Sequence, residues 1–314
     1  MAKLKVLIAD KLASVAKNQL EELGIQAHDK AGIDYADLKD VIQDFDGLIV
    51  RSRTKPAADL IQVADKLKVI GRAGVGVDNI DLEAAKAKNI VVVNTPTSTA
   101  LAVAEHTLAL MLAAVKHIPV ATTRMKEGQW PKNELQAFEL SGKTLGIVGL
   151  GNIGALVAAR ASAFDMQIIA YDPFLDEAIM KQRGAQPQTL DELFATADLI
   201  SFHLPLTDET RALVNQEAFN KMKPGVVIIQ TARGGVIDEE ALLAALNSGR
   251  VRSAGLDVFA IEPPQDSALV QHPNVVTTPH IAAQTAEAQI RAATDVAQEV
   301  ANVLLGKEIR WRVN

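Results

Sequence analysis

Cysteine is absent from the 314 residues of this chain. Its absence excludes disulfides, thiol nucleophiles and the cysteine-containing zinc sites of one large class of alcohol dehydrogenases. A chain without cysteine suits the reducing cytoplasm, and we expect a cytoplasmic protein that holds no metal ion.

Long apolar runs and an excess of positive charge are also missing. The longest apolar stretch, residues 100–115, is shorter than the roughly 20 residues of a membrane-spanning helix and contains Glu105 and His106. Lys and Arg number 32 against 38 Asp and Glu, so the chain lacks the basic surface that nucleic acid requires. The segment 1–6 leads directly into a strand pattern rather than an export signal. We expect a buried helix over 100–115, and neither a membrane nor a nucleic acid as partner.

The residues that are present are typical of a globular protein, with 48% hydrophobic and 22% charged. Short β-branched runs alternate with amphipathic segments, an order typical of parallel sheets covered by helices. The runs lie at 5–9, 47–50, 68–70 and 90–93 in the first half, and at 143–148, 167–171, 198–202, 226–229, 253–256 and 274–277 in the second. The sequence predicts the α/β class, with two Rossmann-like or flavodoxin-like domains.

Two long helical patterns, at 98–117 and 286–305, decide the expected domain organisation. The second pattern follows the last strand, and a final helix needs a sheet to cover. We therefore expect a discontinuous substrate-binding domain, residues 1–98 and 284–314, with a nucleotide-binding domain, residues 99–283, inserted into it. Two helix starts are also predicted, a capping box at Thr189–Glu192 and an acidic first turn at Asp238.

A glycine-rich turn carries the first functional signal. Gly149, Gly151 and Gly154 form a G-x-G-x-x-G pattern between a strand at 145–148 and a helix at 153–164. In this context the first glycine permits the tight turn, the second admits a pyrophosphate, and the third lets the helix pack closely on the strand. The pattern predicts a dinucleotide at the helix N-terminus.

An acidic residue about twenty positions further on bears on which dinucleotide it is. Asp172 ends the next strand, where a carboxylate accepts hydrogen bonds from the ribose hydroxyls, which favours NAD over NADP. Asp172 could also be a plain turn residue before Pro173. Methyltransferases use a similar loop, but the residues further along do not suit them.

Hydride transfer from a hydroxyl-bearing carbon needs a base for the proton and a cation for the substrate. Of the six histidines, His280 follows a predicted strand in a Thr-Pro-His-Ile context, where α/β sheets place their ligands. His203 also follows a strand and is expected to line the cofactor cleft. His106 lies in the buried helix, and the remaining three are interpreted as surface or turn residues: His28, His117 and His272.

Two further residues complete a candidate site. Arg233 follows an apolar strand, where its planar guanidinium would bind a carboxylate through two hydrogen bonds. Glu262 precedes two prolines and by itself would be interpreted as a solvated loop acid.

Three segments together resemble the signature segments of the D-isomer-specific 2-hydroxyacid dehydrogenases. They are residues 231–238, residues 256–259 with Glu262-Pro263-Pro264, and residues 278–281. The resemblance extends over essentially the whole chain, and segments 71–81 and 94–96 are most similar to members that act on a phosphorylated D-2-hydroxy acid.

The resemblance implies roles for these residues. Arg233 would clamp the substrate carboxylate, His280 would exchange the proton with the C2 oxygen, and Glu262 would support His280. The cofactor would be NAD, with Asp257 at its nicotinamide end and a homodimer in contact over residues 99–117. The residues expected to line the cofactor are Gly149, Gly151, Asn152, Ile153, Gly154, Asp172, His203, Leu204, Pro205, Thr210, Thr231, Ala232, Arg233, Asp257, His280 and Ala283.

A phosphorylated substrate needs additional positive charge. Arg51 and Arg72 follow strands of the first domain, and with the Gly74-Val75 loop they are the expected phosphate site, facing the cofactor across an interdomain cleft. Arg53 is interpreted as a surface ion pair, and Lys132 is left open as a substrate contact.

Two kinds of alternative function stay open. One is reduction of another 2-oxo acid of the hydroxypyruvate, glyoxylate or D-lactate type, and the other is an NAD-sensing scaffold similar to corepressors. Because the chain stops after its second domain, we expect no C-terminal amino-acid-sensing domain and no feedback through one.

Overall fold

The computed structural model describes residues 3–314, so the start of the predicted N-terminal segment, Met1 and Ala2, lies outside the described residues. The chain divides into two compact units. The first comprises the described residues up to Ala100 together with Ala283–Asn314, and the second is Leu101–Ala282. The boundaries that the sequence predicts lie between residues 98 and 99 and between residues 283 and 284, within two residues of these.

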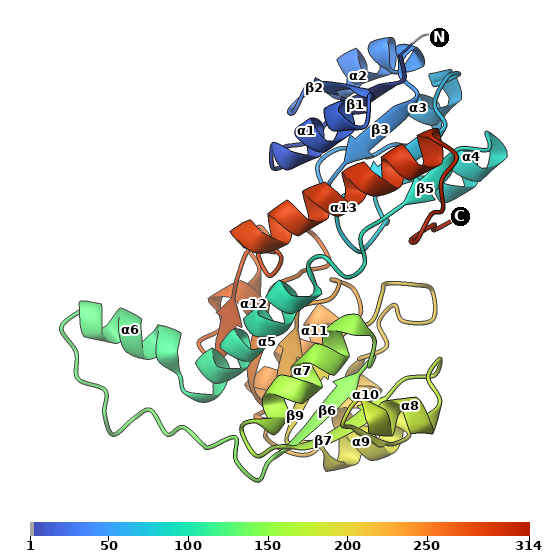
Figure 1. Cartoon of the computed structure of the whole chain (residues 1–314). Coiled ribbons are helices and arrows are strands. Elements are labelled where there is room, and N and C mark those ends of the chain that lie inside the picture. Colours follow the sequence, from blue (N-terminus) through green and yellow to red (C-terminus); the bar gives the residue numbers. More distant parts are fainter. Residues whose placement is uncertain (1–2) are drawn as a thin grey trace. The chain divides into compact units, whose positions relative to one another are not determined.

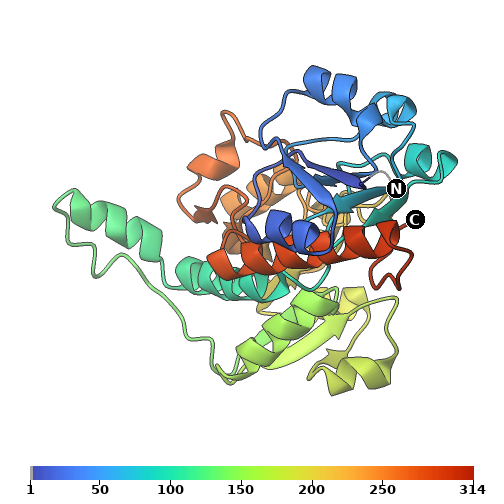
Figure 2. The same cartoon turned by 45° about the horizontal axis from the view of Figure 1, so that its top comes forward.

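The first unit is built on a five-stranded parallel sheet in the order β2-β1-β3-β4-β5, which is the flavodoxin-like order. One face is covered by α1 and α13, and α13 packs along β3, β4 and β5 (Figures 1 and 2). The other face is covered by α2, η1, α3 and α4. The strands are β1 (Lys5–Ile8), β2 (Gln26–Asp29), β3 (Gly47–Val50), β4 (Val69–Arg72) and β5 (Val91–Val93). The helices are α1 (Val15–Glu22), α2 (Tyr35–Val41), η1 (Ile42–Asp44), α3 (Ala58–Val63), α4 (Leu82–Ala87) and α13 (Ala286–Leu304).

The second unit is built on a seven-stranded parallel sheet in the order β12-β11-β10-β9-β6-β7-β8. Counted from β6, this is the Rossmann order, and the strand order reverses between β6 and β9. The strands are β6 (Thr144–Val148), β7 (Gln167–Tyr171), β8 (Gln186–Pro187), β9 (Leu199–Phe202), β10 (Val226–Gln230), β11 (Val251–Leu256) and β12 (Val275–Thr277). The predicted α/β class with two parallel sheets is confirmed.

Helices cover both faces of the second sheet. One face is covered by α5, α7 and α8, and the other is covered by α9, α10, α11 and α12. These helices are α5 (Ala100–Val115), α7 (Asn152–Ser162), α8 (Glu177–Gln182), α9 (Leu190–Thr196), α10 (Gln216–Lys221), α11 (Glu239–Asn247) and α12 (Ala268–Gln271). Local signals set their starts: Thr189 and Glu192 form the predicted capping box, and the Asp238 carboxylate accepts from the backbone N–H groups of Glu240 and Ala241.

Helix α5 is the buried helix that the sequence predicts. Ala104, Leu108 and Met111 are at most 7% exposed and pack into the core of the second unit. Within residues 3–314 no single helix has the length and apolarity to cross a membrane. Helices α5 and α6 (Ile118–Lys126) together have the length and composition for it, but they are bent by 62° at the break between them. The apolar side of α5 is therefore used inside its own unit.

A segment after α5 projects away from the sheet of the second unit (Figures 1 and 2). This α6 arm, residues 118–139, exposes Ile118 by 51%, Met125 by 48% and Trp130 by 75%. Arg124 binds both carboxylate oxygens of Glu134, at 2.7 and 3.1 Å, so the arm is braced internally. Contiguous exposed apolar surface marks interaction sites, and the exposed apolar side chains of this arm supply such surface only if they lie together.

The sequence misjudged two edge strands and one histidine. β2 and β8 are each bonded on one side only, and neither Gln26–Asp29 nor Gln186–Pro187 has the β-branched residues typical of strands. The interpretation of His28 as a surface or turn residue is wrong, because His28 lies in β2 with its ring edge-on to Phe45. His117 and His272 do lie in turns.

Candidate active site

The glycine loop connects β6 to the N-terminus of α7. At Gly149 the backbone φ is +92°, and a Cβ there would lie 2.7 Å from the carbonyl oxygen of His203. A Cβ on Gly154 would lie 2.2 Å from the carbonyl oxygen of Gly149. At Gly151, by contrast, no other heavy atom of the described residues comes within 4 Å of the Cβ position. The loop therefore folds tightly at Gly149 and Gly154 and leaves space at Gly151. This arrangement fits a pyrophosphate at the start of α7.

Asp172 is tied directly to this loop. One carboxylate oxygen accepts from the backbone N–H of Leu150 at 2.9 Å, and the other accepts from that of Phe174 at 3.0 Å. The second bond is the turn that the alternative interpretation expects. Each oxygen keeps a further lone pair, so the turn is compatible with the predicted ribose contact. Sequence reasoning missed Arg183, whose guanidinium donates to the carbonyl of Leu150 beside Asp172.

His203 and Leu204 follow β9 and border the glycine loop. The Leu204 side chain reaches within 3.0 Å of the Cβ position of Gly149. The His203 ring lies 2.9 Å from the hydroxyl of Ser201, and burial lowers the pKa of His203 to about 4, so the ring is neutral near pH 7. Thr210 closes the following loop because its hydroxyl donates to the carbonyl of Pro205 at 2.7 Å.

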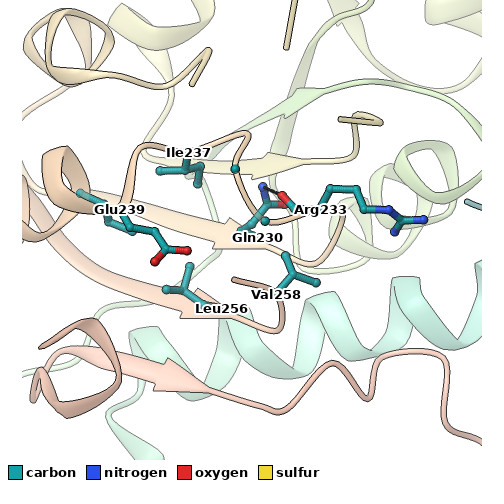
Figure 3. A pocket seen from close by; sticks show the side chains of 9 residues that line it. Gln230, Arg233, Ile237, Glu239, Leu256 and Val258 are labelled. Atoms are coloured by element: carbon teal, nitrogen blue, oxygen red, sulfur yellow. Dashed lines mark hydrogen bonds between the residues drawn. The ribbon is translucent and has the colours of Figure 1, made fainter. Parts of the chain in front are cut away.

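Arg233 sits on a loop that the last residue of β10 holds in place. The buried Gln230 amide accepts from the backbone N–H of Ala232 at 3.0 Å and donates to the carbonyl of Arg233 at 3.1 Å. In Figure 3 the guanidinium of Arg233 points away from the small hollow that Gln230, Glu239 and Val258 help to line. One guanidinium nitrogen also donates to the carbonyl of Ala232 at 2.7 Å. The loop thus fixes the backbone of Arg233, and the guanidinium extends away from this hollow.

His280 and Glu262 form the predicted pair. The Nδ1 atom of His280 lies 2.8 Å from one carboxylate oxygen of Glu262, and the other oxygen accepts from the backbone N–H of Phe259 at 3.1 Å. An ionised carboxylate only accepts, so Nδ1 carries the hydrogen and Nε2 is left for proton exchange. Both side chains are partly exposed, His280 by 48% and Glu262 by 38%. His280 has a φ of +53°, an uncommon conformation for a residue with a side chain.

Asp257 holds the loop that carries His280. Its side chain is fully buried, and its carboxylate accepts from the Thr278 hydroxyl at 2.5 Å and from the backbone N–H groups of Ile281 and Ala282 at 2.9 Å. Burial alone would raise the pKa of Asp257, but these bonds and His106, 3.5 Å away, outweigh it and lower the pKa. The predicted nicotinamide contact of Asp257 stays a prediction, because the carboxylate serves its own loop here.

Two residues of α5 contact these loops and were missed by sequence reasoning. His106 lies 2.9 Å from the Thr278 hydroxyl, and Thr107 lies 2.8 Å from the Thr231 hydroxyl. The available signal was a Glu-His-Thr run inside an otherwise apolar helix.

In the first unit, Arg51 and Arg72 lie at the carboxyl ends of two neighbouring parallel strands. Val50, the last residue of β3, pairs with Arg72 in β4, and Arg51 directly follows Val50. The guanidinium of Arg72 folds over Gly74, where a Cβ would lie 1.5 Å from it and where φ is +142°. Asn94 holds the next residue by donating to the carbonyl of Val75 at 2.6 Å. The positive φ favours glycine at position 74, and any larger side chain would have to displace the Arg72 guanidinium.

A buried carboxylate at Asp10 fixes the loop that begins with Arg51. It accepts from the backbone N–H groups of Arg51 and Thr54, at 2.6 and 3.1 Å, and from the Thr54 hydroxyl at 2.6 Å. Arg53 pairs with Asp10 at 3.3 Å and donates to two backbone carbonyls, so it is tied to the sheet edge. Burial lowers the pKa of Arg51, and Asp10 opposes that shift.

The structure thus groups the predicted residues within each unit. The glycine loop, Asp172, His203 and Leu204 gather where the strand order reverses. Arg233, Asp257, Glu262 and His280 follow the next three strands of the same sheet. The first unit holds Arg51, Arg72, Gly74, Val75 and Ala283, and Lys132 is an exposed residue of the α6 arm.

Comparison with known proteins agrees with this arrangement. The model of the D-isomer specific 2-hydroxyacid dehydrogenase, NAD binding domain, matches residues 108–282. A D-3-phosphoglycerate dehydrogenase from Mycobacterium tuberculosis is 48% identical over 98% of this chain and 58% of that protein. A solved structure from Thermus thermophilus is 35% identical, with a TM-score of 0.88 over 99% of this chain and 100% of that one. A glyoxylate reductase from Paecilomyes thermophila is 31% identical, with a TM-score of 0.91 over 100% and 99%.

The chain belongs to the D-isomer specific 2-hydroxyacid dehydrogenase family, and its second unit carries the family's NAD binding domain. The family and the NAD cofactor that the sequence motifs predict are confirmed. The chain spans about three fifths, 58%, of the length of the curated relatives that it matches.

Proposed function

We propose that this chain catalyses the NAD-dependent oxidation of D-3-phosphoglycerate to 3-phosphooxypyruvate, the first step of serine biosynthesis. The observation that carries the proposal is the His280–Glu262 pair, with Nδ1 of His280 held at 2.8 Å and Nε2 left for substrate. Relatives named for this reaction share 43–48% identity with the chain, which supports the choice of substrate.

The acid–base step falls to His280. In the oxidising direction, Nε2 of His280 takes the proton of the C2 hydroxyl while the C2–H bond breaks and its electron pair leaves with the hydrogen. When bound, the nicotinamide of NAD accepts that hydride. The carboxylate of Glu262 stabilises the imidazolium that forms and keeps the ring oriented. In the reducing direction, His280 returns the proton as an acid.

Arg233 and the first-unit arginines would hold the two charged ends of the substrate. The guanidinium of Arg233, which extends away from the hollow, suits the carboxylate next to C2. The phosphate would be held by Arg51 and Arg72, whose strands end at one edge of the first sheet. Both positions require cations, because D-3-phosphoglycerate carries a carboxylate and a phosphate.

An activity test with His280→Asn separates the enzyme from an NAD-sensing scaffold. Asparagine tolerates a positive φ, so the loop should keep its shape while the acid–base group is lost. Turnover followed through NADH absorbance should fall by about 10²–10⁴-fold, with NADH binding by fluorescence unchanged. Wild-type protein that binds NADH but oxidises no D-2-hydroxy acid would favour the scaffold.

We also propose a homodimer that uses the α6 arm. The apolar side of α5 is already buried, whereas Ile118, Met125 and Trp130 expose large apolar surfaces. Analytical ultracentrifugation of wild type and Trp130→Glu tests this: a dimer that the substitution converts to monomer is expected. A monomeric wild type would contradict it.

A further inference from the structure

Helix α5 places two adjacent polar side chains against two different loops of the candidate site. His106 reaches Thr278, 172 positions away, and Thr107 reaches Thr231, 124 positions away. The first loop carries His280 and the second carries Arg233. One rigid helix therefore contacts the supports of both residues that the proposed mechanism uses.

The hydrogen-bond directions at His106 follow from counting hydrogens. Thr278 has one hydroxyl hydrogen, and the ionised carboxylate of Asp257, at 2.5 Å, can only accept it. The oxygen of Thr278 must therefore accept from Nε2 of His106 at 2.9 Å. The result is a directed chain from His106 through Thr278 to Asp257, with Nε2 of His106 carrying a hydrogen.

The same argument sets the directions at Thr107. Its hydroxyl donates to the carbonyl of Val103 at 2.8 Å, within α5. The hydroxyl of Thr231, at 2.8 Å, must then donate to the oxygen of Thr107. Both threonines are buried, so a valine at position 107 would leave the Thr231 hydroxyl without its acceptor.

Precision matters in the His280 loop because its backbone is in an uncommon conformation. His280 has a φ of +53°, and such residues persist where their surroundings determine them strongly. Here the backbone N–H of His280 donates to the carbonyl of Asp257 at 2.9 Å, and the carboxylate of Asp257 binds the next two N–H groups. His106 and Thr278 in turn orient that carboxylate.

We propose that His106 and Thr107 are positioning residues. Together they fix the position of the loop that carries His280 relative to the loop that carries Arg233. This inference rests on the proposed dehydrogenase function. Neither residue touches the reacting atoms: His106 acts through Thr278 and Asp257, and Thr107 acts through Thr231. Simple packing in the core is the competing explanation, and it predicts that only side-chain volume matters at both positions.

Paired substitutions separate the hydrogen bonds from the volume. His106→Leu removes the donor, whereas His106→Gln keeps an amide N–H at a similar reach. Thr107→Val removes the acceptor, whereas Thr107→Ser keeps it. Ala109→Ser, on the exposed side of the same helix, is the matched control.

Two measurements on each variant are decisive. The first is steady-state kinetics with NAD, in which His106→Leu and Thr107→Val should each lower kcat by about 10–100-fold, since small misplacements have effects of this size. KM for NAD should change less than kcat does, because the glycine loop expected to hold the pyrophosphate is untouched. The Gln and Ser variants should recover most of kcat, and Ala109→Ser should match wild type.

The second measurement is amide hydrogen exchange without substrate, which does not depend on turnover. His106→Leu should speed exchange in residues 278–282 and leave residues 231–233 unchanged, and Thr107→Val should do the reverse. Unchanged exchange in both loops, or equal loss of kcat in the Leu and Gln variants, would overturn the inference.

Two further outcomes are covered by the design. If His106→Leu does not fold, His106→Asn replaces it, since the shorter asparagine amide does not reach Thr278. Amide exchange in residues 278–282 that is equal in His106→Asn and His106→Gln would refute the positioning role. A wild type without turnover would refute the proposed function alone, while the exchange results still decide the inference.

Discussion

Acidification should destabilise the fold through His203, which borders the glycine loop. Burial lowers the pKa of His203 from 6.5 to about 4 in the folded chain, while the unfolded chain keeps the ordinary value. Above pH 6.5 both states are neutral, and the group does not affect stability. Between pH 6.5 and about 4 the unfolded chain binds a proton that the folded chain does not, so stability falls as the pH falls.

The size of this effect follows from the two pKa values. A difference between 6.5 and about 4 corresponds to about 3 kcal/mol of unfolding free energy below pH 4. About 2 kcal/mol of it should be lost between pH 7 and pH 5. Most carboxylates titrate below this window, so the histidine contribution can be isolated.

Urea unfolding of wild type and His203→Gln, followed by circular dichroism at pH 7, 6 and 5, measures this contribution. The glutamine keeps an amide near Ser201 but cannot titrate. Wild type should lose about 2 kcal/mol more than the variant between pH 7 and pH 5. Equal losses in the two proteins would refute the reasoning, as would an NMR titration that places the midpoint of His203 near 6.5.

Three further predictions concern the site. Glu262→Gln should lower the single-turnover rate constant by about 10²-fold, because the charge that stabilises the His280 imidazolium is lost. NADH binding should be unchanged. An unchanged rate constant would contradict this role. Asp10→Asn should reduce the unfolding free energy by about 2–3 kcal/mol and raise KM for D-3-phosphoglycerate, since donors of Arg51 and Thr54 point at that carboxylate. A loss of stability without a change in KM would mean that Arg51 does not bind the phosphate. Asp172→Asn should raise kcat/KM with NADP relative to NAD, as the carboxylate repels a 2′-phosphate; an unchanged ratio would place discrimination elsewhere.

Local patterns were sufficient to predict most of the fold. Inner strands such as β3 (GLIV) and β10 (VVIIQ) are rich in valine and isoleucine, and the capping residues Thr189 and Asp238 mark helix starts with their own side chains. β2 and β8 escaped because neither contains a β-branched residue, whereas the edge strands β5 and β12 are rich in valine and were predicted. Their assignment depends on the neighbouring strand, which a local pattern does not contain.

For the candidate site, sequence identified the groups but not what supports them. The motifs around Arg233, Glu262 and His280 indicated their types, and the structure brings His280 and Glu262 to 2.8 Å. His106 supports the site from a distant position, because it meets Thr278 across 172 residues, whereas Gln230 supports it locally by bonding backbone groups of its own loop. The contact between His106 and Thr278 follows from the packing of α5 on the sheet, because only the folded chain brings these segments together.

The substrate preference of the purified protein tests the central claim most directly. Initial rates with NAD should be measured for D-3-phosphoglycerate, D-glycerate and D-lactate, and in the reverse direction for 3-phosphooxypyruvate, hydroxypyruvate, glyoxylate and pyruvate with NADH. The proposed function predicts the highest kcat/KM for the phosphorylated pair, and a loss of that preference in Arg51→Gln. A higher kcat/KM for glyoxylate, hydroxypyruvate or pyruvate would contradict the proposed substrate while leaving hydride transfer at C2 in place.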